Sequence, residues 1–68
     1  MSEHWGTRKY CRRKFLQAAA GVDTAIDHLL WIHEKLGPTH ESERQLIEGL
    51  CAAGQEYKDL ILDARSRF

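Results

Sequence analysis

One dipeptide, Gly37-Pro38, divides the chain into two long segments and constrains the fold more than any other feature. A glycine just past a helix end can adopt the left-handed conformation, and a proline after it cannot continue the helix. Thr39 follows as a candidate N-cap, and Glu41 and Glu43 suit the first turn of a second helix. These adjacent stop and start signals predict two helices joined by a tight turn.

Apolar residues recur at alternating spacings of three and four on both sides of this turn, which is typical of packed helices and not of strands. The inward row predicted for the first segment is Phe15, Ala19, Val22, Ile26, Leu29, His33 and Leu36, with Ala18, Ala25 and Ile32 beside it. The inward row predicted for the second segment is Leu46, Leu50, Ala53, Tyr57, Leu60 and Ala64, flanked by Ile47, Gly54, Ile61 and Phe68. We therefore predict an all-α antiparallel two-helix hairpin, a single domain over 1–68, with helices over about 7–36 and 40–66 and a turn at 37–39.

These apolar rows cover nearly half of each helix surface, which is more than a two-helix seam can bury. A chain of 68 residues also has little core for its surface, and below roughly 70–80 residues a further source of stabilisation is usual. We expect closure by homodimerisation into an antiparallel four-helix bundle, or by docking on a partner protein. The architecture resembles that of the plasmid copy-control protein Rop, a short hairpin that dimerises, and this comparison concerns the fold alone.

Two glycines are expected at the same height of the hairpin. Folding the chain at the turn brings together positions whose numbers sum to about 75, so Gly21 is expected beside Gly54 among small residues of both helices. Because a helical glycine costs about 0.5–1 kcal/mol relative to alanine, we predict a close helix contact between Gly21 and Gly54. The alternative is a locally weak helix without special packing. The same register keeps Cys11 and Cys51 too far apart for a disulfide.

The cysteines and histidines give no starting motif for a metal site, because no two histidines have the i, i+3 or i, i+4 spacing of one helix face. We predict no metal, no cofactor and a reducing, cytoplasmic location. Residues 12–22 resemble the start of a twin-arginine export signal, but Asp23 and Asp27 interrupt its apolar region. No apolar stretch approaches the ~20 residues of a membrane span, so we expect no membrane partner.

The net charge of zero conceals a separation along the hairpin. Residues 1–14 and 57–68, at the open end, hold eight basic and three acidic residues, a balance of +5, and residues 15–56 hold two basic and seven acidic residues, a balance of −5. The predicted basic-end binding patch comprises Trp5, Arg8, Lys9, Tyr10, Arg12, Arg13, Lys14, Arg65 and Arg67. Guanidinium groups interleaved with aromatic rings suit phosphate, stacked bases or an acidic protein groove. A solvated helix start is the alternative.

Leu30 and Trp31 fall off the inward row, near the acidic turn. We predict that they form an apolar anchor for a partner, and coverage within a homo-oligomer is the alternative. His33 lies on the inward row, where a satisfied core or interface histidine is expected.

No nucleophile beside a base, phosphate-cradling loop or inward pair of carboxylates is recognisable, and we expect no enzymatic activity. The pattern favours a small regulator or inhibitor of a larger macromolecular partner, of the kind that phages and mobile elements direct at nucleic-acid-handling host machinery. The alternative is a Rop-like homodimer that binds RNA, DNA or nucleotide phosphate through the basic end. Size and charge together favour a protein partner over nucleic acid.

Overall fold

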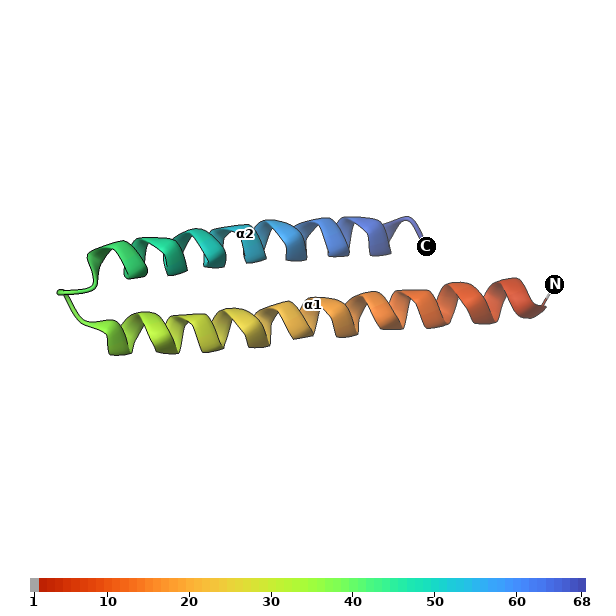
Figure 1. Ribbon diagram of the computed structural model, residues 1–68. Helices are drawn as coiled ribbons and strands as arrows, with labels where there is room; N and C mark the ends of the chain where they lie inside the picture. Colours follow the sequence, from red (N-terminus) through yellow and green to blue (C-terminus); the bar gives the residue numbers. More distant parts are fainter. Residues whose placement is uncertain (1) are drawn as a thin grey trace.

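The molecule consists of two long antiparallel helices joined by a short turn (Figure 1). The computed structural model describes residues 2–68, with side chains described from residue 6 onward. Helix α1 spans Ser2–Leu36 and helix α2 spans Glu41–Ser66. The two helices pack against each other along an elongated shape of 60 × 15 × 10 Å, which confirms the predicted all-α hairpin.

The helix ends differ slightly from those expected. Helix α1 begins at Ser2, five residues before the predicted start, because no proline interrupts its first turns and Gly6 is accommodated within them. Helix α2 begins at Glu41, and the residue before it is His40, with φ −113° and ψ 52° and no side-chain cap hydrogen bond. The prediction of Thr39 as N-cap is therefore wrong.

The turn depends on a left-handed glycine, as predicted. Gly37 has a φ of +68°, a backbone conformation that side chains with a Cβ rarely adopt. The backbone N–H of His40 donates to the carbonyl of Gly37 at 3.3 Å, and the N–H of Arg44 donates to the carbonyl of His40 at 2.9 Å. These two hydrogen bonds connect the end of α1 to the first turn of α2.

The inward row of α1 is the predicted one. Each of its seven residues, from Phe15 to Leu36, is buried or half-buried. The core is nevertheless thin, because Ala19 and Ile61 are the only buried side chains among residues 6–68.

The inward row of α2 differs from the prediction by one position. The residues that face α1 are Arg44, Ile47, Cys51, Gly54, Lys58, Ile61 and Arg65. The predicted row is wrong, since Leu46, Leu50, Ala53, Tyr57 and Leu60 are exposed and only Ala64 is half-buried. Contacts with α1 explain this rotation: Lys58 Nζ reaches Asp23 Oδ1 at 2.9 Å, and the rings of Phe68 and Phe15 lie 5.2 Å apart.

The predicted contact between Gly21 and Gly54 is also wrong. A Cβ on Gly54 would lie 3.2 Å from Ile26 Cγ1, so Gly54 faces α1 between Val22 and Ile26. Gly21 is exposed and a Cβ there would meet nothing within 4 Å. The turn spans 37–40, one residue more than predicted, and Gly54 lies about three residues nearer to the turn along α1 than expected.

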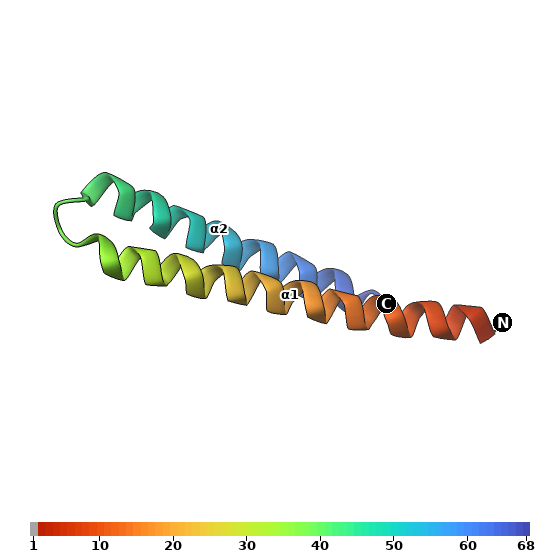
Figure 2. The same ribbon diagram turned by 60° about the horizontal axis from the view of Figure 1, so that its bottom comes forward.

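The N-terminal part of α1 extends past the end of α2, so that the two ends of the chain do not coincide (Figures 1 and 2). The guanidinium of Arg8 donates to the carbonyl oxygen of Phe68 at 3.3 Å, which places the end of α2 level with the second turn of α1. This open end of the hairpin, opposite the turn, is where most of the predicted basic patch lies.

Candidate binding surfaces

One side of the hairpin carries a row of exposed apolar residues, which is continuous on α2 and interrupted on α1 by Gly21 and His28. We call it the apolar face, and it comprises Ala18, Ala25 and Ile32 of α1 and Leu46, Leu50, Ala53, Tyr57 and Leu60 of α2. Each member directly precedes an inward-facing residue in the sequence. Because the helices are both right-handed and run in opposite directions, residues that precede the inward rows lie on the same side of the pair.

The apolar face is open to solvent along its length. Leu46 and Leu60 are 65% and 67% exposed, and Tyr57 is 61% exposed. Side chains of this size are normally buried against another element, and a row of them marks an interaction surface. Sequence reasoning placed these residues inside because they form the most apolar row of α2.

A second feature is a hollow of about 390 Å³ at the open end. We call it the basic hollow; its lining residues are Arg8, Lys9, Arg12, Arg13, Leu16, Arg65 and Phe68. Arg8, Arg12 and Leu16 stand on successive turns of α1, and Arg65 comes from the last turn of α2. Four arginines and one lysine therefore line the hollow together with two apolar side chains, Leu16 and Phe68, which we call its floor.

Five of the nine residues predicted for the basic-end patch line this hollow: Arg8, Lys9, Arg12, Arg13 and Arg65. Tyr10 lies next to them, with the guanidinium carbon of Arg13 5.9 Å from its ring centre. Lys14 is exposed and does not line the hollow, and Arg67 instead pairs with Asp63 at 3.3 Å. The side chain of Trp5 lies outside the described residues.

The floor of the hollow was missed by sequence reasoning. Leu16 follows Arg12 at the i, i+4 spacing of one helix face, and this signal was available from the sequence. The position of Phe68 depends on the register between the helices, which places its ring against Phe15. Phe68 remains 43% exposed, so part of its surface is open to the hollow.

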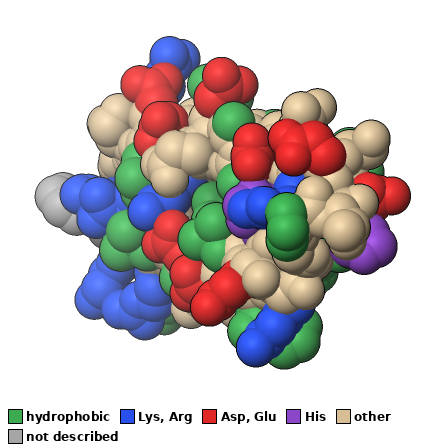
Figure 3. All heavy atoms as spheres, turned by 90° about the vertical axis from the view of Figure 1, so that its left-hand side faces the viewer, with side chains coloured by type: hydrophobic (Ala, Val, Ile, Leu, Met, Phe, Trp, Pro, Cys, Tyr) green, Lys and Arg blue, Asp and Glu red, His purple; other side chains and the backbone are tan. Residues whose placement is uncertain are grey.

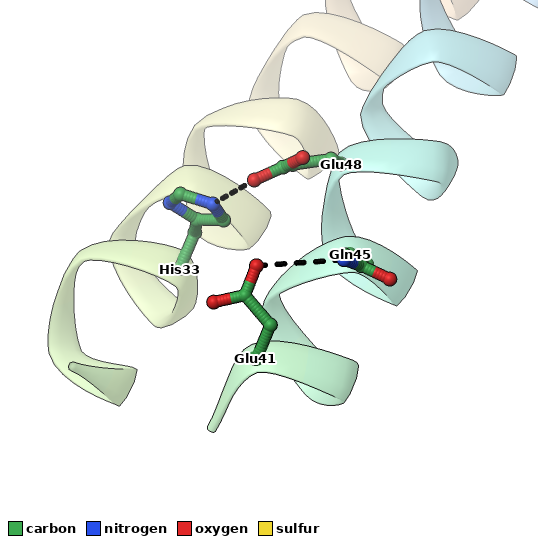
Figure 4. A network of polar contacts seen from close by, with 4 residues as sticks. All are labelled: His33, Glu41, Gln45 and Glu48. Atoms are coloured by element: carbon green, nitrogen blue, oxygen red, sulfur yellow. Dashed lines mark hydrogen bonds and ion pairs between the residues drawn. The ribbon is translucent and has the colours of Figure 1, made fainter. Parts of the chain in front are cut away.

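Near the turn, polar contacts join the two helices and brace the start of α2 (Figure 4). His33 Nε2 and Glu48 Oε2 lie 2.7 Å apart across the interface, so the inward histidine has a hydrogen-bond partner, as expected. Gln45 Nε2 donates to Glu41 Oε1 at 3.4 Å within α2. Only the His33–Glu48 pair crosses between the helices here.

Leu30 and Trp31, the predicted apolar anchor, are 52% and 60% exposed. The ammonium of Lys35 lies 5.5 Å from the ring centre of Trp31, within the range of a cation–π contact. Leu30 directly follows the inward Leu29, which places it on the side opposite the apolar face. The anchor and the apolar face are therefore separate surfaces.

The surface at the turn end carries side chains of several kinds (Figure 3). Seen from the turn end, acidic side chains and histidines are spread over the near surface, and the largest group of Lys and Arg side chains lies toward the lower left (Figure 3). Hydrophobic side chains reach the surface between these charged groups. The surface of the molecule is thus mixed in character near the turn.

Cys11 and Cys51 are both free and half-buried, in agreement with the expectation of no disulfide. Within the part of the chain that the structure describes, no cluster of three or more His, Cys, Asp or Glu side chains is placed to hold a metal ion. None of the helices in those residues combines the length and apolar character needed to cross a bilayer.

Comparisons of the chain with protein-family models, with curated proteins and with solved structures found no match. Its function is therefore argued from the two helices and the surfaces that they present.

Proposed function

We propose that the chain is a non-enzymatic helical binding protein that regulates or inhibits a larger macromolecular partner, and that it acts as a homodimeric four-helix bundle. The observation that carries this proposal is the exposed apolar face. The accessible surface of the hairpin is 5531 Å², against about 4400 Å² for a folded monomer of this mass. A second copy laid on the apolar face would remove its largest exposed side chains from water.

The arrangement of residue sizes on the apolar face supports a second copy in the antiparallel orientation. Ala53 lies midway between Leu46 and Leu60 on α2, and Ala25 lies midway between Ala18 and Ile32 on α1. Both alanines lie near the same height, because Gly54 packs between Val22 and Ile26. A two-fold axis at this height places Leu46 against Leu60 of the second copy and brings the small residues together at the centre.

The distribution of charge supports the same orientation. The open end carries a balance of +5, and residues 15–56 carry −5. In an antiparallel dimer the basic end of each hairpin lies beside the acidic, turn-proximal part of the other. A parallel dimer would instead bring the two basic ends together.

The surface that would meet the larger partner is the one that this dimer leaves uncovered. Leu30 lies on the opposite side of α1, and Trp31 next to it is 60% exposed. A large aromatic side chain ringed by polar groups is a common anchor in protein–protein interfaces. We expect Trp31→Ala to weaken capture of the partner in affinity purification while the mass of the dimer stays the same.

The first test of the proposal is the mass in solution, measured by light scattering after size exclusion. We expect about 16 kDa, twice the chain mass of 7.9 kDa. Leu50→Lys should abolish the dimer, because a charge would be buried within the contact, about one helical turn from its centre. The matched control is Leu30→Lys, the same exchange on the opposite side, which should remain dimeric. A wild-type chain that is well folded and has a mass of 7.9 kDa would refute the proposal.

A second test addresses orientation and does not require a folded monomer. In a Cys11→Ser, Cys51→Ser background, chains with Leu46→Cys and chains with Leu60→Cys are mixed and oxidised. The antiparallel dimer predicts disulfides between the two different variants, since Leu46 faces Leu60 of the second copy. A dimer that forms no disulfide between the two different variants would contradict the antiparallel arrangement.

A further inference from the structure

We propose that the basic hollow binds nucleotide units of a single-stranded nucleic acid, with a phosphate on its guanidinium groups and a base against Phe68. This site lies at the open end and uses residues outside the apolar face and outside the Leu30–Trp31 anchor. It therefore goes beyond the proposed regulatory function and does not depend on it.

The first argument is uncompensated charge. Two basic side chains outside the hollow have acidic partners: Lys58 pairs with Asp23 at 2.9 Å and Arg67 pairs with Asp63 at 3.3 Å. Among residues 6–68, no carboxylate side chain forms an ion pair with the five cations that line the hollow. Five positive charges gathered around one concave surface favour a phosphate-bearing ligand.

The second argument is a polar atom at the hollow that the fold leaves without a partner. Two buried arginine nitrogens, Nε of Arg44 and Nε of Arg65, have no hydrogen-bond partner among the described residues, and of these two residues only Arg65 lines the hollow. A guanidinium donates in a planar fork that matches phosphate oxygens. An anion in the hollow would supply acceptors to Arg65 and to Arg12 at the same time.

The third argument is the apolar floor, which distinguishes a nucleotide from a simple anion. Phe68 is held against Phe15, with ring centres 5.2 Å apart, and 43% of it stays exposed. Elsewhere in α1, the guanidinium carbon of Arg13, a lining residue, is 5.9 Å from the ring centre of Tyr10, which does not itself line the hollow. Aromatic rings interleaved with guanidinium groups are the usual platform for bases of single strands, whereas bases within a duplex are not free to stack.

The size and spacing of the hollow agree with this ligand. Its volume of about 390 Å³ falls in the range of roughly 300–1,000 Å³ that holds small ligands. Arg8 and Arg12 repeat along α1 at i, i+4, about 6 Å apart along the axis, and Lys9 and Arg13 form a second such row. The two rows can follow a phosphate backbone along α1.

The test is fluorescence anisotropy of the full chain with a labelled single-stranded oligothymidylate, at two or more salt concentrations. We expect binding that weakens with salt, and Arg12→Ala should weaken it about tenfold and reduce the salt slope by about one phosphate contact. The matched control is Arg67→Ala, which removes the same charge at the same end from a residue that pairs with Asp63 and does not line the hollow. It should change the affinity by less than about twofold, as expected for a contact that does not touch phosphate.

Phe68→Leu separates stacking from charge. It keeps the apolar floor and all cations, and we expect an affinity lower by about fivefold or more, since base–aromatic stacking is lost. Circular dichroism of each variant verifies that the hairpin is intact. Competition by the unlabelled oligonucleotide alone would support a strand as the ligand, and equal competition by free thymidine monophosphate at comparable concentration would contradict it.

Two further results would overturn the proposal. One is equal or tighter binding of an oligoglutamate peptide of the same charge, with no effect of Phe68→Leu, which would identify the hollow as a site for acidic proteins. The other is the absence of binding to the oligonucleotide at low salt, where electrostatic attraction is strongest.

Discussion

At the scale of single residues, Gly54 sets the distance between the helices near the middle of the hairpin. A Cβ there would lie 3.2 and 3.3 Å from two atoms of Ile26 and 3.8 Å from Val22. Gly49, five positions earlier on the same helix, would meet nothing within 4 Å. The same substitution made at Gly54 and at Gly49 therefore separates the effect of helix–helix packing on stability from the effect of helix propensity.

We predict that Gly54→Leu lowers the free energy of unfolding by about 1–3 kcal/mol, because the side chain forces α1 and α2 apart. Gly49→Leu should instead leave it unchanged or raise it by up to about 1 kcal/mol, through the higher helix propensity of leucine. Urea unfolding followed by circular dichroism at one protein concentration measures both. Equal stability of the two variants would show that Gly54 is not in close contact with α1.

At the scale of elements, the sequence was sufficient to predict both helices, the turn and the inward row of α1. Gly37-Pro38 marks the turn, and the apolar residues of α1 fall on one unambiguous row. In α2 two adjacent rows compete, and the more apolar one, with Leu46, Leu50 and Leu60, is the exposed one.

The inward row of α2 could not be predicted from hydrophobicity because it contains Lys58 and Arg65. Long basic side chains can lay their aliphatic stems along an apolar surface and keep the charged end in water or in an ion pair. Lys58 does so with Asp23. The cations of the basic hollow can be predicted because charge is visible in the sequence. The position of Phe68 in its floor cannot, because the register that brings Phe68 to Phe15 is set by the turn.

The turn itself allows a prediction at this scale. Gly37 has a φ of +68°, whereas no other glycine has a positive φ among the described residues. Gly37→Ala should therefore lower the free energy of unfolding by about 1–2 kcal/mol. Gly49→Ala is the matched control and should raise it by about 0.5–1 kcal/mol, since its backbone is already helical. Thermal unfolding of both variants at one protein concentration measures the two changes. A Gly37→Ala variant that is more stable than the wild type would mean that the turn does not need the left-handed conformation.

At the scale of the whole molecule, the separation of charge gives the dimer a salt dependence whose sign reports its orientation. In the antiparallel dimer unlike charges face each other, so added sodium chloride should raise the dissociation constant several-fold as the attraction is screened. A parallel dimer would place like charges together, and the same salt would lower the dissociation constant. Sedimentation equilibrium over a range of salt concentrations measures this sign, and tighter association in salt would contradict the antiparallel arrangement.

The single covalent connection between the helices has a further consequence for how the molecule opens. The turn holds α1 and α2 together at one end, whereas Arg8 and Phe68, which meet at the other end, are sixty positions apart in the sequence. Local unfolding starts most easily where few buried contacts resist it, so amide protons near the open end are expected to exchange faster than those near the turn. A ligand that bridges Arg12 and Arg65 would stabilise the closed state of the open end, which is the part of the hairpin that unfolds first. By linkage, the free energy of opening at this end would in turn help to set the affinity for the ligand.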